Sequence, residues 1–279
     1  MAETVKVPVD GVAVTAIGVA VIRARESERE DRLYDDPLAQ AFVTAARAGF
    51  GEQRWTQLEA LADQFFDGRT IGVRLVDERF EAAVAAGCRQ IVLLGAGLDT
   101  RAYRMNLPQD ITVFEIDLPE LFDFKEPVLA ATEATPTCQR RVIVADLRED
   151  WRKALLDSGF QPSVPTYWVD EGSLGYLNQD WNRSVVLTLT ELSAPGSRFG
   201  AGRVAVDPDA PPYRELRNFV GREAPPEHMA RPADFDVEAW LDEIGWDTQF
   251  HSWNDMTAHL DRPAGPLNPR IGSIAAIRR

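Results

Sequence analysis

Two apolar runs that end in glycines and carboxylates are the part of this chain best suited to bind a small molecule. The run 91–94 leads into Gly95-Ala96-Gly97, and the run 111–116 leads into Asp117. The first pattern predicts a buried strand followed by a tight turn without side chains, against which a ligand can lie. An acid at the end of the neighbouring strand can accept hydrogen bonds from both hydroxyls of a ribose. We therefore expect a nucleoside-containing cofactor at the carboxyl ends of a parallel sheet, although a G-x-G pair alone could simply form a turn.

The residues after the glycine turn separate two classes of cofactor. A dinucleotide fold has a third glycine that brings the helix close to a pyrophosphate, but Thr100 occupies that place here. Asp99 would repel a pyrophosphate, whereas it suits a cofactor that carries an ammonium and a sulfonium. The sequence favours S-adenosylmethionine over NAD.

Composition restricts the function further. The chain has 279 residues, 45% of them hydrophobic, and a formal net charge of −14. A strongly acidic surface disfavours nucleic acid and anionic membranes as partners, because both need clustered lysine and arginine. The two cysteines are fifty residues apart, so we expect no disulfide and a cytoplasmic protein. The apolar run 11–22 is too short to span a membrane and does not resemble a signal peptide.

The order of the elements predicts one α/β unit with a helical N-terminal third. Residues 1–10 look like a loose tail, residues 1–88 a helical cap, and residues 89–279 an α/β core. Expected strands cover 90–95, 111–116, 141–145, 165–170, 198–206, 246–251 and 271–277, and expected helices cover 12–25, 37–48, 55–66, 71–86, 118–131, 149–158, 178–193 and 237–244. Repeated βα units imply a mostly parallel sheet with helices on both faces. Six prolines between 206 and 235 predict an irregular segment with at most short helices, and we expect a lid or substrate wall at about 207–235.

Several motifs in colinear order make the chain similar to the leucine carboxyl methyltransferase–like family of O-methyltransferases, including its bacterial small-molecule and polyketide branch. They are Arg32-Leu33-Tyr34-Asp35-Asp36-Pro37-Leu38-Ala39, Leu93-Leu94-Gly95-Ala96-Gly97-Leu98-Asp99-Thr100-Arg101-Ala102-Tyr103-Arg104, Glu115-Ile116-Asp117-Leu118-Pro119-Glu120, Ala145-Asp146-Leu147-Arg148-Glu149-Asp150-Trp151, Glu171-Gly172-Ser173-Leu174-Gly175-Tyr176-Leu177 and Glu191-Leu192-Ser193-Ala194-Pro195-Gly196-Ser197. The resemblance implies a Rossmann-like class I methyltransferase fold and S-adenosyl-L-methionine as cofactor. It does not specify the substrate.

The resemblance also implies positions in a cofactor site. Gly95, Ala96 and Gly97 would face the methionine part, Asp117 and Leu118 the ribose, Asp146 and Leu147 the adenine, and Glu171 the cofactor ammonium. Asp146 could instead only begin a helix. The family's arginine for the cofactor carboxylate lies in a pattern like R-T-R-x-x-D, and its first arginine falls on Gly72 in this sequence.

Another arginine must then bind the cofactor carboxylate. We assign this role to Arg74, with Arg69 as the alternative. Arg23 or Arg25 could close over the cofactor from the cap.

No residue is an obvious catalytic base. Methyl transfer mainly requires alignment of the reactants, and a carboxylate acceptor is already ionised near neutral pH. The histidines are isolated and lack metal-ligand spacing, so we expect no metal. Tyr176 could hydrogen-bond to the acceptor, and His228 could act as a base for a hydroxyl. The sequence thus predicts an enzyme that methylates a carboxylate, or failing that a hydroxyl, of a small molecule or peptide; a non-catalytic S-adenosylmethionine-binding protein and a nicotinamide oxidoreductase are the alternatives.

Overall fold

The computed structural model describes residues 5–203, 210–221, 235–262 and 270–279. Its seven strands are β1 (Gln90–Leu94), β2 (Thr112–Asp117), β3 (Gln139–Val144), β4 (Thr166–Asp170), β5 (Arg198–Arg203), β6 (Trp246–Ser252) and β7 (Gly272–Arg278). They form one sheet in the order β3-β2-β1-β4-β5-β7-β6. Neighbouring strands from β3 to β5 pair in parallel, and β7 is antiparallel to both β5 and β6. The predicted mostly parallel α/β sheet is confirmed.

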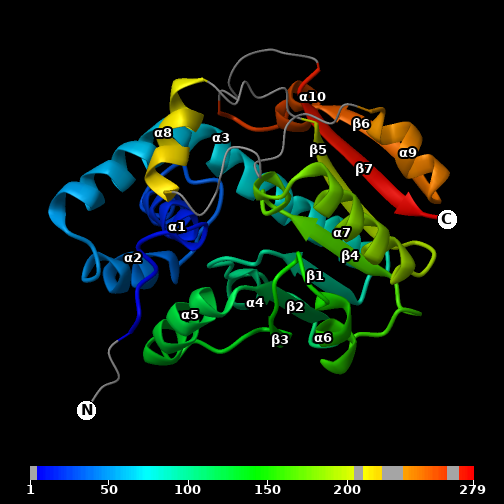
Figure 1. Cartoon of the computed structure of the whole chain (residues 1–279), viewed down its shortest axis with the longest axis horizontal. Coiled ribbons are helices and arrows are strands. Elements are labelled where there is room, and N and C mark those ends of the chain that lie inside the picture. The colour runs from blue at the N-terminus through cyan, green and yellow to red at the C-terminus, as the bar shows by residue number, and fades with distance from the viewer. Residues whose placement is uncertain (1–4, 204–209, 222–234, 263–269) are drawn as a thin grey trace.

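Helices cover both faces of the sheet, and the N-terminal helices form a layer beyond the carboxyl ends of its parallel strands (Figure 1). They are α1 (Ala13–Ser27), α2 (Ala39–Arg47), α3 (Glu52–Ala85), α4 (Arg101–Arg104), α5 (Pro119–Ala131), α6 (Trp151–Asp157), α7 (Gln179–Glu191), α8 (Pro211–Val220), α9 (Val237–Glu243) and α10 (Trp253–Thr257), with a 3₁₀ turn, η1, at Leu174–Tyr176. No helix in these ranges is long and apolar enough to cross a membrane.

The strand β1 lies in the middle of the sheet, and every one of its residues is buried. Helices on both faces explain why Ile91–Leu94 is an uninterrupted apolar run rather than an alternating one. One face packs against a cluster around Trp168 and Trp246, and the other against a cluster around Phe80 and Tyr167. A third cluster joins α1, α2, α3, α5 and α8.

The long helix α3 corrects the prediction of two helices at 55–66 and 71–86. It runs without a break through Gly68 and Gly72. A glycine inside a helix costs only about 1 kcal/mol relative to alanine. That cost is exceeded here because the first half of α3 packs into the cap cluster through Leu58 and Leu61, and the second half packs against the sheet through Phe80.

Two segments near the cap are more ordered than the sequence predicts. Val5, Val7 and Val9 pack against the cap cluster instead of forming a loose tail, and Arg54 donates to the Val9 carbonyl at 2.8 Å. Within the proline-rich segment, residues 211–220 form α8, which packs against α3. Proline is favoured in the first turn of a helix, where Pro211 and Pro212 lie. The remainder of the expected lid, 204–209 and 222–234, lies outside the described residues.

Candidate active site

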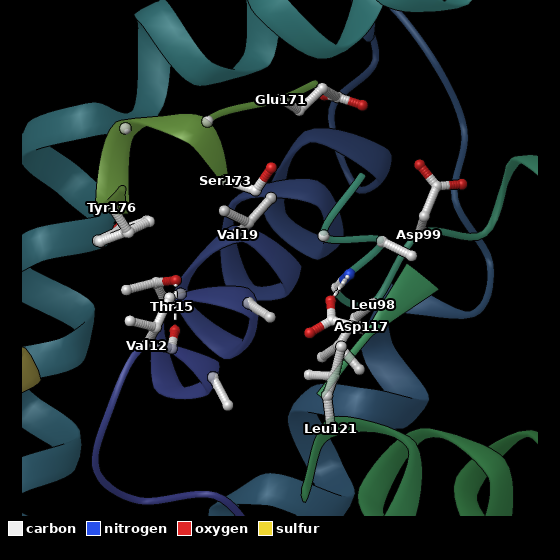
Figure 2. Close-up of a pocket in the computed structure, with 18 of the residues that line it drawn as sticks. Val12, Thr15, Val19, Leu98, Asp99, Asp117, Leu121, Glu171, Ser173 and Tyr176 are labelled. Carbon is white, nitrogen blue, oxygen red and sulfur yellow. Dashed lines mark hydrogen bonds between the residues drawn. The ribbon is translucent and has the colours of Figure 1, made fainter. Parts of the chain in front are cut away.

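A cavity of about 760 Å³ opens at the carboxyl ends of β1, β2 and β4. The helices α1, α3 and α8 form its other walls. Figure 2 shows Val12, just before α1, and Thr15 and Val19 of α1 facing Leu98, Asp117 and Leu121 across the opening. The carboxyl ends of parallel strands are the usual ligand site of an open α/β sheet, so the cavity lies where the fold places function.

The glycine turn lines this cavity and depends on close packing. Gly95 has φ +67° and Gly97 has φ +53°, a region that favours glycine. A Cβ on Gly95 would lie 2.4 Å from the Ser173 Cβ, and one on Gly97 would lie 3.5 Å from the Ala16 Cβ. Gly95 therefore makes room for the loop after β4, whereas at Gly97 a Cβ would make only an ordinary contact with α1 and the positive φ is the reason for glycine.

Asp117, at the end of β2, lines the cavity. Its carboxylate accepts hydrogen bonds from the backbone, including one from the glycine turn that follows the neighbouring strand β1. Its Oδ2 accepts from the Gly97 N–H at 2.6 Å, and its Oδ1 accepts from the Leu118 N–H at 2.7 Å. These bonds use two of about four acceptor positions, which leaves one on each oxygen for a hydroxyl. Burial raises the pKa of Asp117 to about 6, more than the two N–H bonds lower it.

A buried ion network joins the turn to the loop after β4. Arg101, only 2% exposed, pairs with Asp77 at 2.7 Å and also with Asp99 and Glu171. Arg104 binds the same Asp77 through both terminal nitrogens at 2.7 and 2.8 Å. Burial raises the pKa of Asp99, but the charges of Arg101, Lys125 and Arg23 and the hydrogen bond from the Arg101 N–H together outweigh burial and hold this pKa below its ordinary value.

Glu171, expected to face an ammonium, thus already holds one cation within the protein. Its side chain remains one-quarter exposed, at 25%, and together with Asp99 it lines the cavity. An ammonium placed between these two carboxylates would be attracted by both. No local signal predicts that Arg101 joins these two carboxylates, although Arg101 follows Asp99-Thr100 within the family motif.

The structure corrects the assignment of Arg74. Its guanidinium binds Glu78 at 3.0 Å on the same helix and lies outside the described lining of the cavity. Arg69 lines the cavity instead, and its Nη1 donates to the Glu171 carbonyl at 3.1 Å. None of the carboxylates within the described ranges forms an ion pair with Arg69, so its charge is available to an anion. On α3, residues 69 and 74 are five positions apart, which places them on different faces.

Arg23 couples the cap to the glycine turn and also lines the cavity. Its Nη1 donates to Asp36 at 2.8 Å, and its Nη2 donates to the Leu98 carbonyl at 2.5 Å. Thr100, the residue in place of a third glycine, donates to the same Asp36 at 2.8 Å. Asp36 belongs to one of the family motifs, but the sequence could not show that it binds two partners from distant segments.

Three further predicted residues, Asp146, Leu147 and Tyr176, also line the cavity. Asp146 and Leu147 line the cavity, and Asp146 is held by the backbone N–H and the guanidinium of Arg148, which lowers its pKa. Tyr176 lines it from η1 and is hydrogen-bonded with Thr15; burial raises its pKa. His228 lies outside the described residues.

The fold and the site define a class I methyltransferase. A family comparison then makes the assignment specific: residues 16–190 match leucine carboxyl methyltransferase, and the chain belongs to that family. A relative from Saccharopolyspora erythraea is 43% identical, over 95% of this chain and 93% of its own length; one from Parafrankia is 38% identical, over 96% and 87%. Both are assigned by name as S-adenosyl-L-methionine-dependent methyltransferases.

Solved structures support the fold as well. A crystal structure of a methyltransferase from Thermobifida fusca superposes with a TM-score of 0.53 at 21% identity, covering 97% of this chain and 95% of the other. The predicted family is confirmed, and the cofactor predicted from the sequence is the one that its relatives carry in their names. The nicotinamide alternative is set aside by this membership.

Proposed function

We propose that this protein is an S-adenosylmethionine-dependent O-methyltransferase that acts on a carboxylate of a small-molecule or peptide acceptor. The observation that supports it best is the grouping of Asp117, the Asp99–Glu171 pair and Arg69 in one cavity. These groups match a ribose, an ammonium and a carboxylate, which are the three polar parts of the cofactor.

The residues divide the binding of the cofactor between them. Asp117 accepts from the ribose hydroxyls with Leu118 beside it, and Leu147 packs on the adenine near Asp146. Asp99 and Glu171 attract the ammonium, and Arg69 binds the carboxylate. Bound S-adenosylmethionine supplies a methyl group on a positively charged sulfur.

A carboxylate acceptor fits the titratable groups of the cavity. Among the described lining residues there is no histidine. Tyr176 has a raised pKa, so it stays protonated at neutral pH and can donate a hydrogen bond but cannot serve as a base. An acceptor that is already ionised needs no base. A hydroxyl acceptor remains the second choice, because it would need a base and the carboxylates of the cavity are assigned to the cofactor.

The test combines binding with the chemistry of the product. Calorimetric titration with S-adenosylhomocysteine is expected to show one site, and labelled methyl groups are expected to appear on carboxylic acids. Mild base should release the label as methanol, because esters hydrolyse there and ethers do not. Cofactor binding without transfer to any acid or alcohol would favour the non-catalytic alternative, and a base-stable product would move the acceptor to a hydroxyl.

A further inference from the structure

The side of the cavity that faces Asp117 and the glycine turn has an almost entirely apolar wall (Figure 2). This wall is formed by three helices of the cap, through Val12, Ala16 and Val19 at and in α1, Leu58, Leu61, Ala62 and Phe65 in α3, and Leu216 and Phe219 in α8. The hydroxyl of Thr15, beside them, donates to the Val12 carbonyl at 2.7 Å. We call these nine residues the apolar wall.

The apolar wall is elongated rather than round. Its residues on α3 follow one stripe at i, i+3, i+4 and i+7, and Arg69 continues that stripe at i+11. At a rise of about 1.5 Å per residue, the distance along the axis from Leu58 to Arg69 is about 16 Å. The helix α1 runs beside α3 in the same direction, because Gly18 lies next to Leu58 and Arg25 pairs with Asp63. The two helices thus line an elongated part of the cavity, which we call the slot, and one end of the slot is charged.

The charged end of the slot is the one that meets the cofactor groups. Arg69 contacts the loop of Glu171, and Arg23 contacts the turn at Leu98. Tyr176 lies beside Thr15 of α1 (Figure 2), is hydrogen-bonded with it and is close enough to Arg69 to feel its charge. The polar groups of the cofactor are matched at Asp117, Asp99 and Glu171, so the apolar wall is left for the body of the acceptor.

We propose that the methyl acceptor is a straight-chain carboxylic acid, with its hydrocarbon chain along the apolar wall and its carboxylate at the Tyr176 end. This inference rests on the proposed function and adds the class of substrate. An apolar chain gains free energy from the wall, whereas a charge there would be buried without a partner. One carboxylate oxygen forms the new O–CH₃ bond, the S–CH₃ bond breaks, and its electron pair stays on sulfur. The products are a methyl ester and S-adenosylhomocysteine, and no proton moves.

The test uses the purified full chain and a series of straight-chain monocarboxylic acids, each compared with the dicarboxylic acid of the same length. We expect kcat/KM for the monocarboxylic acids to rise about fourfold for each buried methylene until the slot is full. The dicarboxylic acids should react at least tenfold more slowly, because their second charge would face the apolar wall.

Two variants test where the hydrocarbon chain of the acid binds. Ala62→Phe fills the slot and should move the optimum to shorter acids, whereas Leu61→Ala lengthens it and should move the optimum to longer ones. Ala60→Phe is the matched control, since Ala60 is exposed on the same helix. Titration with S-adenosylhomocysteine shows whether each variant keeps a folded cofactor site.

The outcomes separate this inference from the proposed function. If the wild-type protein does not bind S-adenosylhomocysteine, both the proposed function and this inference are wrong. Methyl transfer that is equal for mono- and dicarboxylic acids, or an optimum that neither variant moves, would overturn the inference and leave the methyltransferase intact. Failure of every acid despite cofactor binding would also refute it.

Discussion

Replacing Asp117 by asparagine keeps the shape of the side chain and removes its charge. Both carboxylate oxygens accept backbone N–H groups, from Gly97 at 2.6 Å and from Leu118 at 2.7 Å. An asparagine offers one acceptor oxygen, and its NH₂ must face the other N–H. The unpaired N–H costs about 1–3 kcal/mol. Against this stands the burial of the native charge, which raises the pKa of Asp117 from 3.8 to about 6.

The lost hydrogen bond lowers the free energy of unfolding, whereas the removal of the buried charge raises it. Affinity for the cofactor has no such compensation. The raised pKa of Asp117 means that its charge destabilises the folded state by about 3 kcal/mol at pH 7. Removing the charge therefore compensates for the lost hydrogen bond, and we expect the free energy of unfolding to change by no more than about 2 kcal/mol. Each hydrogen bond from a ribose hydroxyl to the carboxylate contributes about 1.5–3 kcal/mol, so affinity for S-adenosylhomocysteine should fall by about 100-fold or more.

The pH dependence gives a second, independent measurement of the same group. Between 3.8 and about 6 the folded chain holds more protons on Asp117 than the unfolded chain. Asp117 therefore destabilises the fold above pH 6, and this effect is relieved as the pH falls through 6 toward 4. Cofactor binding should weaken over the same range, since the protonated carboxyl is a poorer acceptor.

Urea denaturation and calorimetric titration from pH 8 to pH 5 measure both effects. The exposed Asp123→Asn on α5 serves as the control, and Asp117→Asn should remove this group's share of the pH dependence. The reasoning is refuted if the variant binds S-adenosylhomocysteine as well as wild type, or if its binding is lost only because the chain unfolds.

Three further outcomes follow from contacts around the cavity. Arg69→Met should lower the affinity for S-adenosylhomocysteine by about tenfold or more in calorimetry, whereas Arg74→Met, outside the cavity lining, should leave it unchanged; the opposite result would restore the sequence-based assignment. Arg101→Met leaves buried carboxylates without their cation and should reduce the free energy of unfolding by about 3–5 kcal/mol in urea; a loss below 1 kcal/mol would show that the network is not formed. Gly95→Ala should destabilise the chain by about 2 kcal/mol or more, because of its positive φ and the 2.4 Å contact of the new Cβ. Gly68→Ala, with open space around its Cβ in α3, should stabilise it by about 0.5–1 kcal/mol, and equal effects of these two alanines would contradict the packing described at the turn.

Local patterns predicted the features that depend on neighbouring residues. The strand of 90–95 and the turn at Gly95-Ala96-Gly97 could be read because buried parallel strands are uniformly apolar and tight turns need glycine. The position of Asp117 followed from the end of the next apolar run, since parallel neighbours end at the same edge of the sheet. Local signals failed at Gly68 in α3, where packing at both ends of the helix outweighs the intrinsic cost of glycine.

The sequence by itself determined the sheet and the family and predicted a cofactor site, because these depend on short motifs with fixed spacing. Only the tertiary structure decided which arginine faces the cavity, because Arg69 and Arg74 have the same chemistry and differ only in the face of α3 that carries them. It alone also brought Asp77, Arg101 and Glu171 together from segments far apart in the chain, and lined α1, α3 and α8 up into one apolar wall. Those contacts depend on how helices pack against each other, which no local spacing in the sequence specifies.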